Sequence, residues 1–117
     1  MSDNRLYYLA APLAPEKGET VKTNLARAKR YLRKFNLAGY HTIAPWIGLV
    51  ESLDEEDPEH RRLGMEVATR ALRLCGGIIL CGPRVSSGML AELDIAEELD
   101  LAVIARIETS EEEDYAY

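Results

Sequence analysis

CGGIILCGPRVSSGMLAELDIAEE, from Cys75 to Glu98, is the stretch that decides the fold of this chain. Gly77 to Cys81 is typical of a short buried strand, and Gly82 to Ser87 forms a turn rich in Gly, Pro and Ser. Ser86 or Ser87 is expected to cap the helix that follows. The free N–H groups and the dipole at the start of that helix favour an anion such as a phosphate or a carboxylate.

One acidic residue of the predicted helix lies among apolar residues. At about 100° per residue, Glu92 falls in the middle of the apolar arc, whereas Asp94, Glu97 and Glu98 lie on the opposite arc. The apolar arc consists of Gly88, Met89, Leu93, Ile95, Ala96 and Leu99. Because carboxylates on a surface helix normally face water, an inward Glu92 needs either a buried partner such as an arginine or a chemical role.

Length and composition predict a single globular domain. The chain has 117 residues, of which 47% are hydrophobic, and a net charge of −6. This charge argues against non-specific binding to nucleic acid or to an anionic membrane. No apolar run approaches the ~20 residues that span a bilayer, and the N-terminus lacks the features of a signal peptide, so a cytoplasmic location is expected.

The cysteines and histidines predict neither a disulfide nor a metal site. Cys75 and Cys81 bracket the central strand and are expected to lie ~20 Å apart, beyond disulfide reach. With His41 and His60 they show no zinc-binding spacing. No metal and no cofactor are predicted.

Strand and helix patterns alternate along the chain. Three further strands are predicted at Arg5 to Ala11, Tyr40 to Ala44 and Leu101 to Ile107. A helix over Gly18 to Asn36, with Thr20 or Thr23 near its start, is expected to bury Val21, Leu25, Ala28, Leu32 and Phe35. A second helix, capped by Asp57 with Pro58 at its first position, is expected to bury Leu63, Val67, Ala71 and Leu74.

Trp46 is expected to open a loop that runs through Asp57. A tryptophan just after a strand could stack on a planar ligand. The sequence equally allows Trp46 to seal the edge of the core or to contact another subunit.

The alternation of strands and helices predicts a three-layer α/β fold of the flavodoxin or Rossmann-like type. Its four- to five-stranded parallel sheet is expected in the order second, first, third, fourth. Such a sheet binds ligands outside the carboxyl ends of the strands, where the strand order reverses. This places the loop from Ala10 to Leu13 opposite Gly82 to Gly88, with the predicted Trp46 loop at the same edge.

Several motifs in this arrangement resemble the nucleoside 2-deoxyribosyltransferase-like superfamily, in particular its small single-domain branch. The resemblance covers nearly the whole chain up to Ile107, and its most specific part is the S-x-G-x-x-x-E spacing from Ser86 to Glu92. The supporting segments are YLAAP (Tyr8 to Pro12), NLARA (Asn24 to Ala28), PEHRRLG (Pro58 to Gly64) and GPRVSSGMLAELDIA (Gly82 to Ala96).

The resemblance implies cleavage of an N-glycosidic bond, with transfer of the sugar to another base or to water. It assigns the nucleophile to Glu92 and the residue that positions sugar and carboxylate to Tyr8. A carboxylate can attack the anomeric carbon to form a glycosyl-enzyme, as in retaining glycosidases. Ser86 matches the position that holds the sugar or its 5′-phosphate. The predicted substrate-binding set is Ala10, Ala11, Pro12, Trp46, Arg84, Ser86, Ser87 and Gly88.

The chain departs from the family at three positions. Gly76 and Ala68 replace two Asp residues, one of which assists at the base, so the obvious proton donor for the leaving base is missing. General acid catalysis typically contributes ~10² to 10⁴-fold, so activity is expected to be weak, rerouted or absent. Arg84 has no clear counterpart, and it could bind a phosphate or pair with the acidic residues after Trp46.

Three hypotheses therefore remain. The chain is an enzyme acting on a nucleoside or nucleoside 5′-monophosphate, a non-catalytic module that binds such a ligand, or a structural domain in which Glu92 belongs to a buried ion pair. The resemblance also implies a homodimer or a higher homo-oligomer. Residues 1–107 are expected to form the domain and residues 108–117 an acidic tail.

Overall fold

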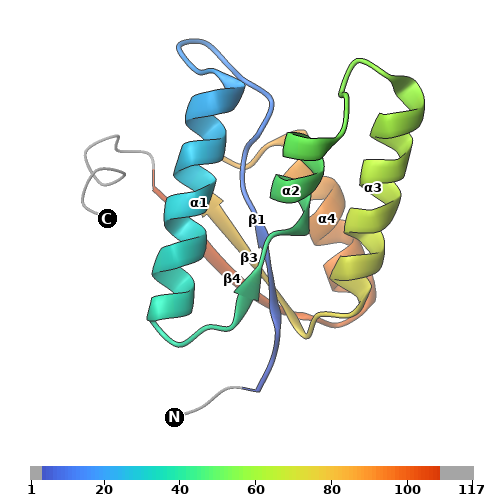
Figure 1. Ribbon diagram of the computed structural model, residues 1–117. Coiled ribbons are helices and arrows are strands. Elements are labelled where there is room, and N and C mark those ends of the chain that lie inside the picture. The colour runs from blue at the N-terminus through green and yellow to red at the C-terminus, as the bar shows by residue number, and fades with distance from the viewer. Residues whose placement is uncertain (1–3, 109–117) are drawn as a thin grey trace.

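A parallel sheet with the strand order β2-β1-β3-β4 forms the centre of the computed structural model, which describes residues 4–108 (Figure 1). This confirms the predicted α/β class and the predicted order. The strands are β1 (Tyr7–Ala10), β2 (Thr42–Ile43), β3 (Gly77–Gly82) and β4 (Ala102–Ile107). The helices are α1 (Val21–Leu37), α2 (Pro45–Ser52), α3 (Pro58–Arg73) and α4 (Ser87–Glu98).

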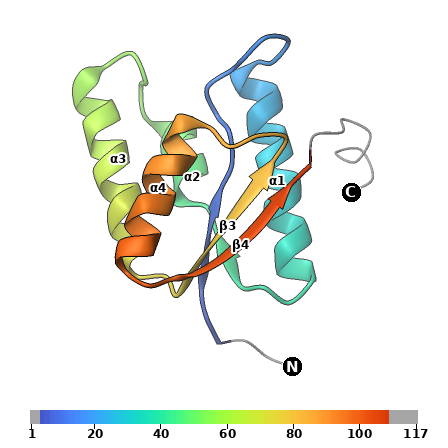
Figure 2. The same cartoon turned by 180° about the vertical axis from the view of Figure 1, so that it is seen from behind.

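Helices cover the two faces of the sheet unequally. Helix α1 packs on one face, whereas α2, α3 and α4 lie on the other, as the two opposite views show (Figures 1 and 2). Successive β1 side chains alternate between these layers, so Tyr7 enters the core under α1 and Tyr8 enters the core under α3 and α4. Tyr8 is fully buried, and in the sheet it pairs with Ile78 of β3.

Helix α1 begins at a capping box and buries a different stripe from the one predicted. The Thr20 side chain accepts a hydrogen bond from the Thr23 backbone N–H at 3.0 Å. Of the predicted stripe only Ala28 and Phe35 are buried; the other two buried residues are Asn24 and Tyr31. The apolar pattern missed Asn24 because this polar side chain is buried by its hydrogen bonds to the loop before the helix.

The predicted loop after Trp46 is wrong, because Pro45–Ser52 forms helix α2. Pro45 ends strand β2, and it also suits the first position of a helix, where its missing N–H is not needed. The fold therefore has four helices within the described residues instead of the predicted three.

The predicted buried stripe of α3 is wrong at three of its four positions, and only Ala71 faces the core. Leu63, Val67 and Leu74 are exposed, Leu74 with 82% of its surface. The inward face carries small residues and one large one, namely Gly64, Ala68, Ala71 and Leu72. Small side chains let α3 lie close to α2, as at Gly64, where an added Cβ would meet Leu53 Cδ1 at 3.6 Å.

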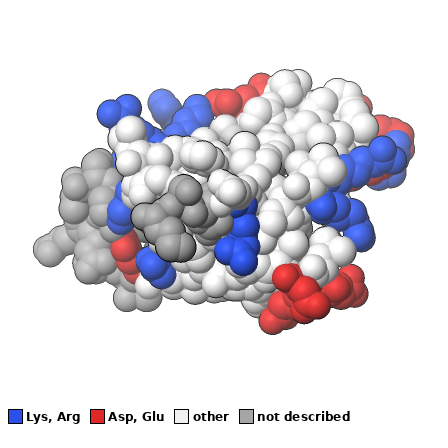
Figure 3. Space-filling view, turned by 90° about the horizontal axis from the view of Figure 1, so that it is seen from below, with Lys and Arg blue, Asp and Glu red and all other residues white. Residues whose placement is uncertain are grey.

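Acidic and basic side chains are interspersed on the face seen in Figure 3, and no continuous basic stripe crosses it. Within residues 4–108, no helix is both long enough and apolar enough to cross a membrane. Most of the predicted acidic tail lies outside the described residues. Its first residue, Glu108, accepts a hydrogen bond from the Tyr31 hydroxyl at 3.0 Å.

Candidate active site

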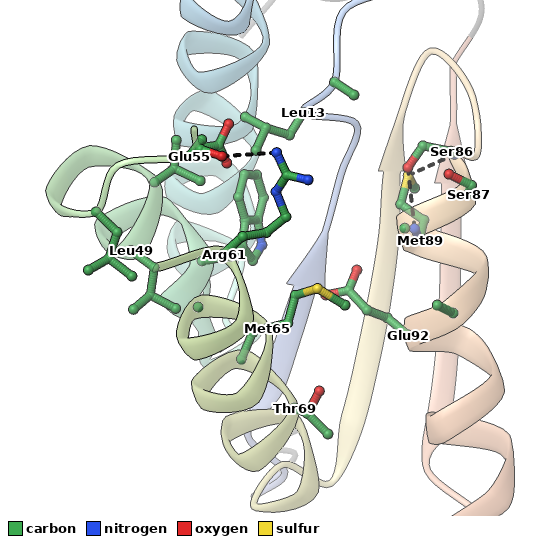
Figure 4. Close-up of a pocket in the computed structure, with 18 of the residues that line it drawn as sticks. Leu13, Leu49, Glu55, Arg61, Met65, Thr69, Ser86, Ser87, Met89 and Glu92 are labelled. Carbon is green, nitrogen blue, oxygen red and sulfur yellow. Dashed lines mark hydrogen bonds between the residues drawn. The ribbon is translucent and has the colours of Figure 1, made fainter. Parts of the chain in front are cut away.

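A cavity of about 750 Å³ lies at the carboxyl ends of the strands, between α3 and α4 and bordered by α2 (Figure 4). Its size is in the range of pockets that bind small organic ligands. One wall is the start of α4, and the facing wall is formed by α2 and α3. The described lining residues are Ala11, Leu13, Ala14, Trp46, Leu49, Val50, Leu53, Asp54, Glu55, His60, Arg61, Gly64, Met65, Ala68, Thr69, Leu72, Ser86, Ser87, Gly88, Met89, Ala91, Glu92 and Ile95.

Glu92 projects from the second turn of α4 toward α3, into this cavity (Figure 4). The Tyr8 hydroxyl donates a hydrogen bond to Glu92 Oε2 at 2.5 Å. It is the only hydrogen bond that the Glu92 side chain makes with the described residues, and no arginine or lysine pairs with it. The structure thus gives Glu92 a tyrosine partner and leaves its other oxygen, Oε1, available to a ligand.

Burial changes the protonation of both groups. It raises the pKa of Glu92 from an ordinary value of 4.5 to about 7, an effect that the Tyr8 hydrogen bond partly offsets. Burial, together with the nearby carboxylate, also raises the pKa of Tyr8 above its usual range. Tyr8 therefore stays a hydrogen-bond donor, while Glu92 changes its charge close to neutral pH.

The raised pKa predicts that ionised Glu92 destabilises the fold. Because the folded-state pKa is above the unfolded value, the contribution of Glu92 to stability is most favourable below about pH 4.5 and is lost as the pH rises through 7. Glu92→Gln is therefore expected to increase the free energy of unfolding by roughly 1–3 kcal/mol at pH 8.5 and by much less at pH 5. Urea denaturation at both pH values measures this, with the exposed Glu97→Gln of the same helix as control. An equal change at both pH values would contradict the prediction.

The start of α4 forms the second polar part of the cavity. Ser86 caps the helix, and its Oγ accepts a hydrogen bond from the Met89 N–H at 3.3 Å. Ser86, Ser87 and Gly88, three residues of the predicted substrate-binding set, all line the cavity. Their position at a helix N-terminus favours a ligand oxygen or an anionic group.

The loop after β1 contributes a different set of residues from the one predicted. Ala11 lines the cavity together with Leu13, whereas Ala10 and Pro12 are fully buried behind it. An added Cβ on Gly82 would lie 2.8 Å from Pro12 Cδ, so this loop and the loop before α4 touch. Ala10 and Pro12 thus lie next to the cavity lining and not in it.

Arg84 pairs with the loop between β1 and α1. Its guanidinium donates to Glu19 Oε1 at 2.5 Å and to the Ala14 carbonyl at 3.0 Å, and it lies 3.2 Å from Glu16 Oε2. Asn24 joins the same network by donating to Glu19 Oε1 and to the Leu13 carbonyl. Arg84 is not among the described lining residues, and it does not pair with the acids after Trp46. It holds the Leu13 to Glu19 loop against the loop before α4.

This network predicts that Glu19 stabilises the fold through its charge. The Arg84 hydrogen bond lowers the pKa of Glu19 to about 2, so its contribution is present above about pH 4.5 and is lost as the pH falls toward 2. Glu19→Gln is expected to lower the free energy of unfolding by about 1–2 kcal/mol at pH 7 and by less at pH 3. The control is Glu51→Gln, whose ion pair with Lys29 is half-exposed and is expected to contribute less than ~0.5 kcal/mol. Urea denaturation of both variants measures the difference, and equal losses would contradict it.

Trp46 forms part of the cavity wall from the first turn of α2. Its Nε1 donates to the Leu9 carbonyl at 2.7 Å, which fixes α2 over the end of β1. Its ring packs against the core under α3 and α4 and also lines the cavity. The ring thus seals the edge of the core beside the cavity, and its stacking on a planar ligand stays a prediction.

Sequence reasoning missed the α3 wall, which contributes Arg61, Met65 and Thr69 (Figure 4). A usable signal was present, because Gly64, Ala68 and Ala71 place small residues on one helix face. Of the two positions at which the resemblance implied an Asp, Ala68 lines the cavity. Gly76 precedes β3 at the amino end of the sheet, so it lies at the opposite end from the cavity. Of these two positions, only Ala68 therefore bears on the cavity.

The described residues contain no cluster of three or more His, Cys, Asp or Glu side chains that could hold a metal ion. Cys75 and Cys81 are buried on opposite faces of the sheet. His60 accepts a hydrogen bond from the Asp54 N–H at its Nδ1, at 2.9 Å, and thereby braces the loop between α2 and α3.

The model of a family described as a domain of unknown function (DUF7768) matches residues 5–106. No curated protein matches the sequence. One solved structure with a similar fold is a 2-deoxyribosyltransferase from the psychrotolerant bacterium Bacillus psychrosaccharolyticus, with a TM-score of 0.61 and 18% sequence identity. The alignment covers 86% of this chain and 70% of that chain. It confirms the fold that the sequence motifs predicted.

Proposed function

This chain belongs to the family described as a domain of unknown function (DUF7768), a description that assigns no activity, and we propose that it cleaves the N-glycosidic bond of nucleosides or nucleoside 5′-monophosphates. The sugar passes to a second base or to water. The observation that carries the proposal is the Glu92 carboxyl group, which lines the cavity with Tyr8 bound to only one of its oxygens. The shared fold with a 2-deoxyribosyltransferase supports the same class of reaction.

In the proposed reaction, ionised Glu92 attacks the anomeric carbon C1′ through Oε1. A C1′–O bond forms, the C1′–N bond breaks, and its electron pair leaves with the base. Attack by a second base or by water on C1′ then releases the carboxylate. Two displacements at the same carbon retain the configuration of the sugar.

Tyr8 positions the carboxylate for this attack. Its hydroxyl holds Oε2 at 2.5 Å and stabilises the charged form of Glu92. Because Tyr8 is fully buried and lies within the sheet, its hydrogen bond fixes the orientation of a side chain that projects from a separate helix. We propose that the sugar lies between Glu92 and Ser86, with its 5′ end at the start of α4.

Base release from a panel of nucleosides and their 5′-monophosphates, followed by chromatography, tests the proposal. The protein is expected to release at least one free base, and Glu92→Ala is expected to abolish the release. A panel without any base release would overturn the enzymatic proposal.

The second candidate is a binding module that keeps the cavity and lacks turnover. The observation that favours it is Ala68, which leaves the α3 wall opposite Glu92 without a carboxylic acid. Such a module is expected to be stabilised against thermal unfolding by a nucleoside or nucleotide without releasing base. The expected homo-oligomer and the cytoplasmic location stay predictions.

A further inference from the structure

Arg61 is the one arginine or lysine among the described residues that line the cavity. It extends from the first half of α3, and its guanidinium points toward the side where Leu13 lies (Figure 4). The other lining residues with ionisable side chains are Asp54, Glu55 and Glu92, which are acidic, and His60. The Nδ1 of His60 already accepts a hydrogen bond from the Asp54 N–H in the loop between α2 and α3. A single cation thus faces a cavity whose remaining charges are negative.

The guanidinium of Arg61 has free hydrogen-bonding capacity. Its Nη2 donates to the Glu55 carbonyl at 3.0 Å, and it forms no ion pair with any residue from 4 to 108. The next residue differs, because Arg62 pairs with Glu59 and Glu66 on the outside of α3. Since a guanidinium carries five N–H donors in a planar fork, most of the Arg61 donors remain available to a ligand.

The location of Arg61 assigns it to the base of the proposed substrate. Arg61 and Ala68 are seven residues apart, which is two helical turns, so they share one face of α3. That face lies across the cavity from Glu92 and from the start of α4 (Figure 4). If Glu92 contacts C1′ and the 5′ end of the sugar lies at Ser86, the base is directed toward α2 and α3.

We infer that Arg61 binds the acceptor edge of the base and makes the site selective for oxo-bases over their amino counterparts. This inference rests on the proposed function. A guanidinium donates to both O6 and N7 of hypoxanthine or guanine, whereas the amino group of adenine or cytosine offers donors where Arg61 also has donors.

The same contact compensates for the acid that Ala68 lacks. When the C1′–N bond breaks, its electron pair gives the base a negative charge, which an oxo-base delocalises onto its exocyclic oxygen. Arg61 stabilises that charge without giving up a proton, and the released base takes its proton from water.

Base selectivity before and after removal of the guanidinium tests this inference. The wild-type protein is expected to have a kcat/KM for inosine about 10- to 100-fold above that for adenosine, and Arg61→Met is expected to bring the ratio close to one. Arg62→Met is the matched control and is expected to keep the wild-type ratio. Thermal unfolding of both variants checks that they are folded. An unchanged ratio in Arg61→Met, or a wild-type preference for adenosine, would overturn the inference.

Binding of free bases separates this inference from the proposed function. In the Glu92→Gln background, calorimetry is expected to show tighter binding of hypoxanthine than of adenine, and Arg61→Met is expected to remove the difference. If the wild-type protein releases no base but this difference is observed, the glycosidic reaction fails and base recognition by Arg61 stands. If base is released but neither selectivity nor binding depends on Arg61, the reaction stands and this inference fails. Absence of both release and binding overturns both.

Discussion

Replacing Glu92 with glutamine is expected to lower base release by at least about 10³-fold, because the amide cannot act as the nucleophile. The substitution keeps the shape of the side chain, and its amide oxygen, placed where Glu92 Oε2 lies, can still accept the hydrogen bond from Tyr8. Since the variant is also expected to be at least as stable as the wild type above pH 7, lost activity cannot be attributed to unfolding. Single-turnover assays with an inosine or deoxyinosine substrate measure the effect.

The pH dependence of the wild-type reaction gives a second measure of the same group. Only the ionised carboxylate attacks C1′, so kcat/KM is expected to rise with pH around an apparent pKa of about 7. Tyr8→Phe removes the hydrogen bond that lowers this pKa, so the midpoint is expected to move to higher pH and activity at pH 7 to fall. Tyr40→Phe, on the opposite side of the sheet, is the control and is expected to leave the profile unchanged. A profile that falls as the pH rises through 7 would contradict the nucleophilic role and indicate a proton donor.

Replacing Gly82 with alanine is expected to lower the free energy of unfolding by about 3–5 kcal/mol. This value combines the cost of a strained backbone conformation with the cost of a steric clash. Gly82 ends β3 with φ +113°, a conformation that residues with a side chain rarely adopt. An added methyl group would also lie 2.8 Å from Pro12 Cδ, where the β1 loop crosses the end of β3. Either the proline or the start of the turn before α4 must then move.

Gly48→Ala is the matched control for this substitution. Gly48 lies within α2, has no positive φ, and nothing lies within 4 Å of an added Cβ. Because alanine favours a helix more than glycine does, Gly48→Ala is expected to stabilise the protein by about 0.5–1 kcal/mol. Urea denaturation at pH 7 measures both variants. A loss of less than 1 kcal/mol in Gly82→Ala would show that the two loops are not held as closely as the structure places them.

The sequence was sufficient to predict the sheet and the direction of Glu92. Strand periodicity and the rule of right-handed crossovers led to the observed strand order. The position of Glu92 within the apolar arc of α4 led to its inward orientation. The strand order and the orientation of Glu92 both follow from regular repeats of apolar residues along the chain. Such a repeat shows which face of a single helix or strand is buried, but not which distant residues that face contacts.

Contacts between segments that are far apart in the sequence were harder to predict. Strand alternation showed only that Tyr7 and Tyr8 face opposite layers, and it was the family resemblance that assigned Tyr8 to the carboxylate. In the structure, the register of β1 with β3 and the placement of α4 bring the Tyr8 hydroxyl to Glu92. For Arg84 the sequence offered a phosphate or the acids after Trp46, and neither alternative included its partner Glu19, which is 65 residues away in a loop without a repeating pattern. The α3 wall was missed because a helix that borders a cavity leaves large apolar residues exposed and turns small ones inward.

Trp46 is the only tryptophan of the chain, and its ring borders the ligand space while its Nε1 holds the Leu9 carbonyl. The intrinsic fluorescence of the protein therefore originates mainly at the candidate active site. Ligand entry beside the indole is expected to change its emission intensity or wavelength, which provides a label-free titration that does not depend on turnover.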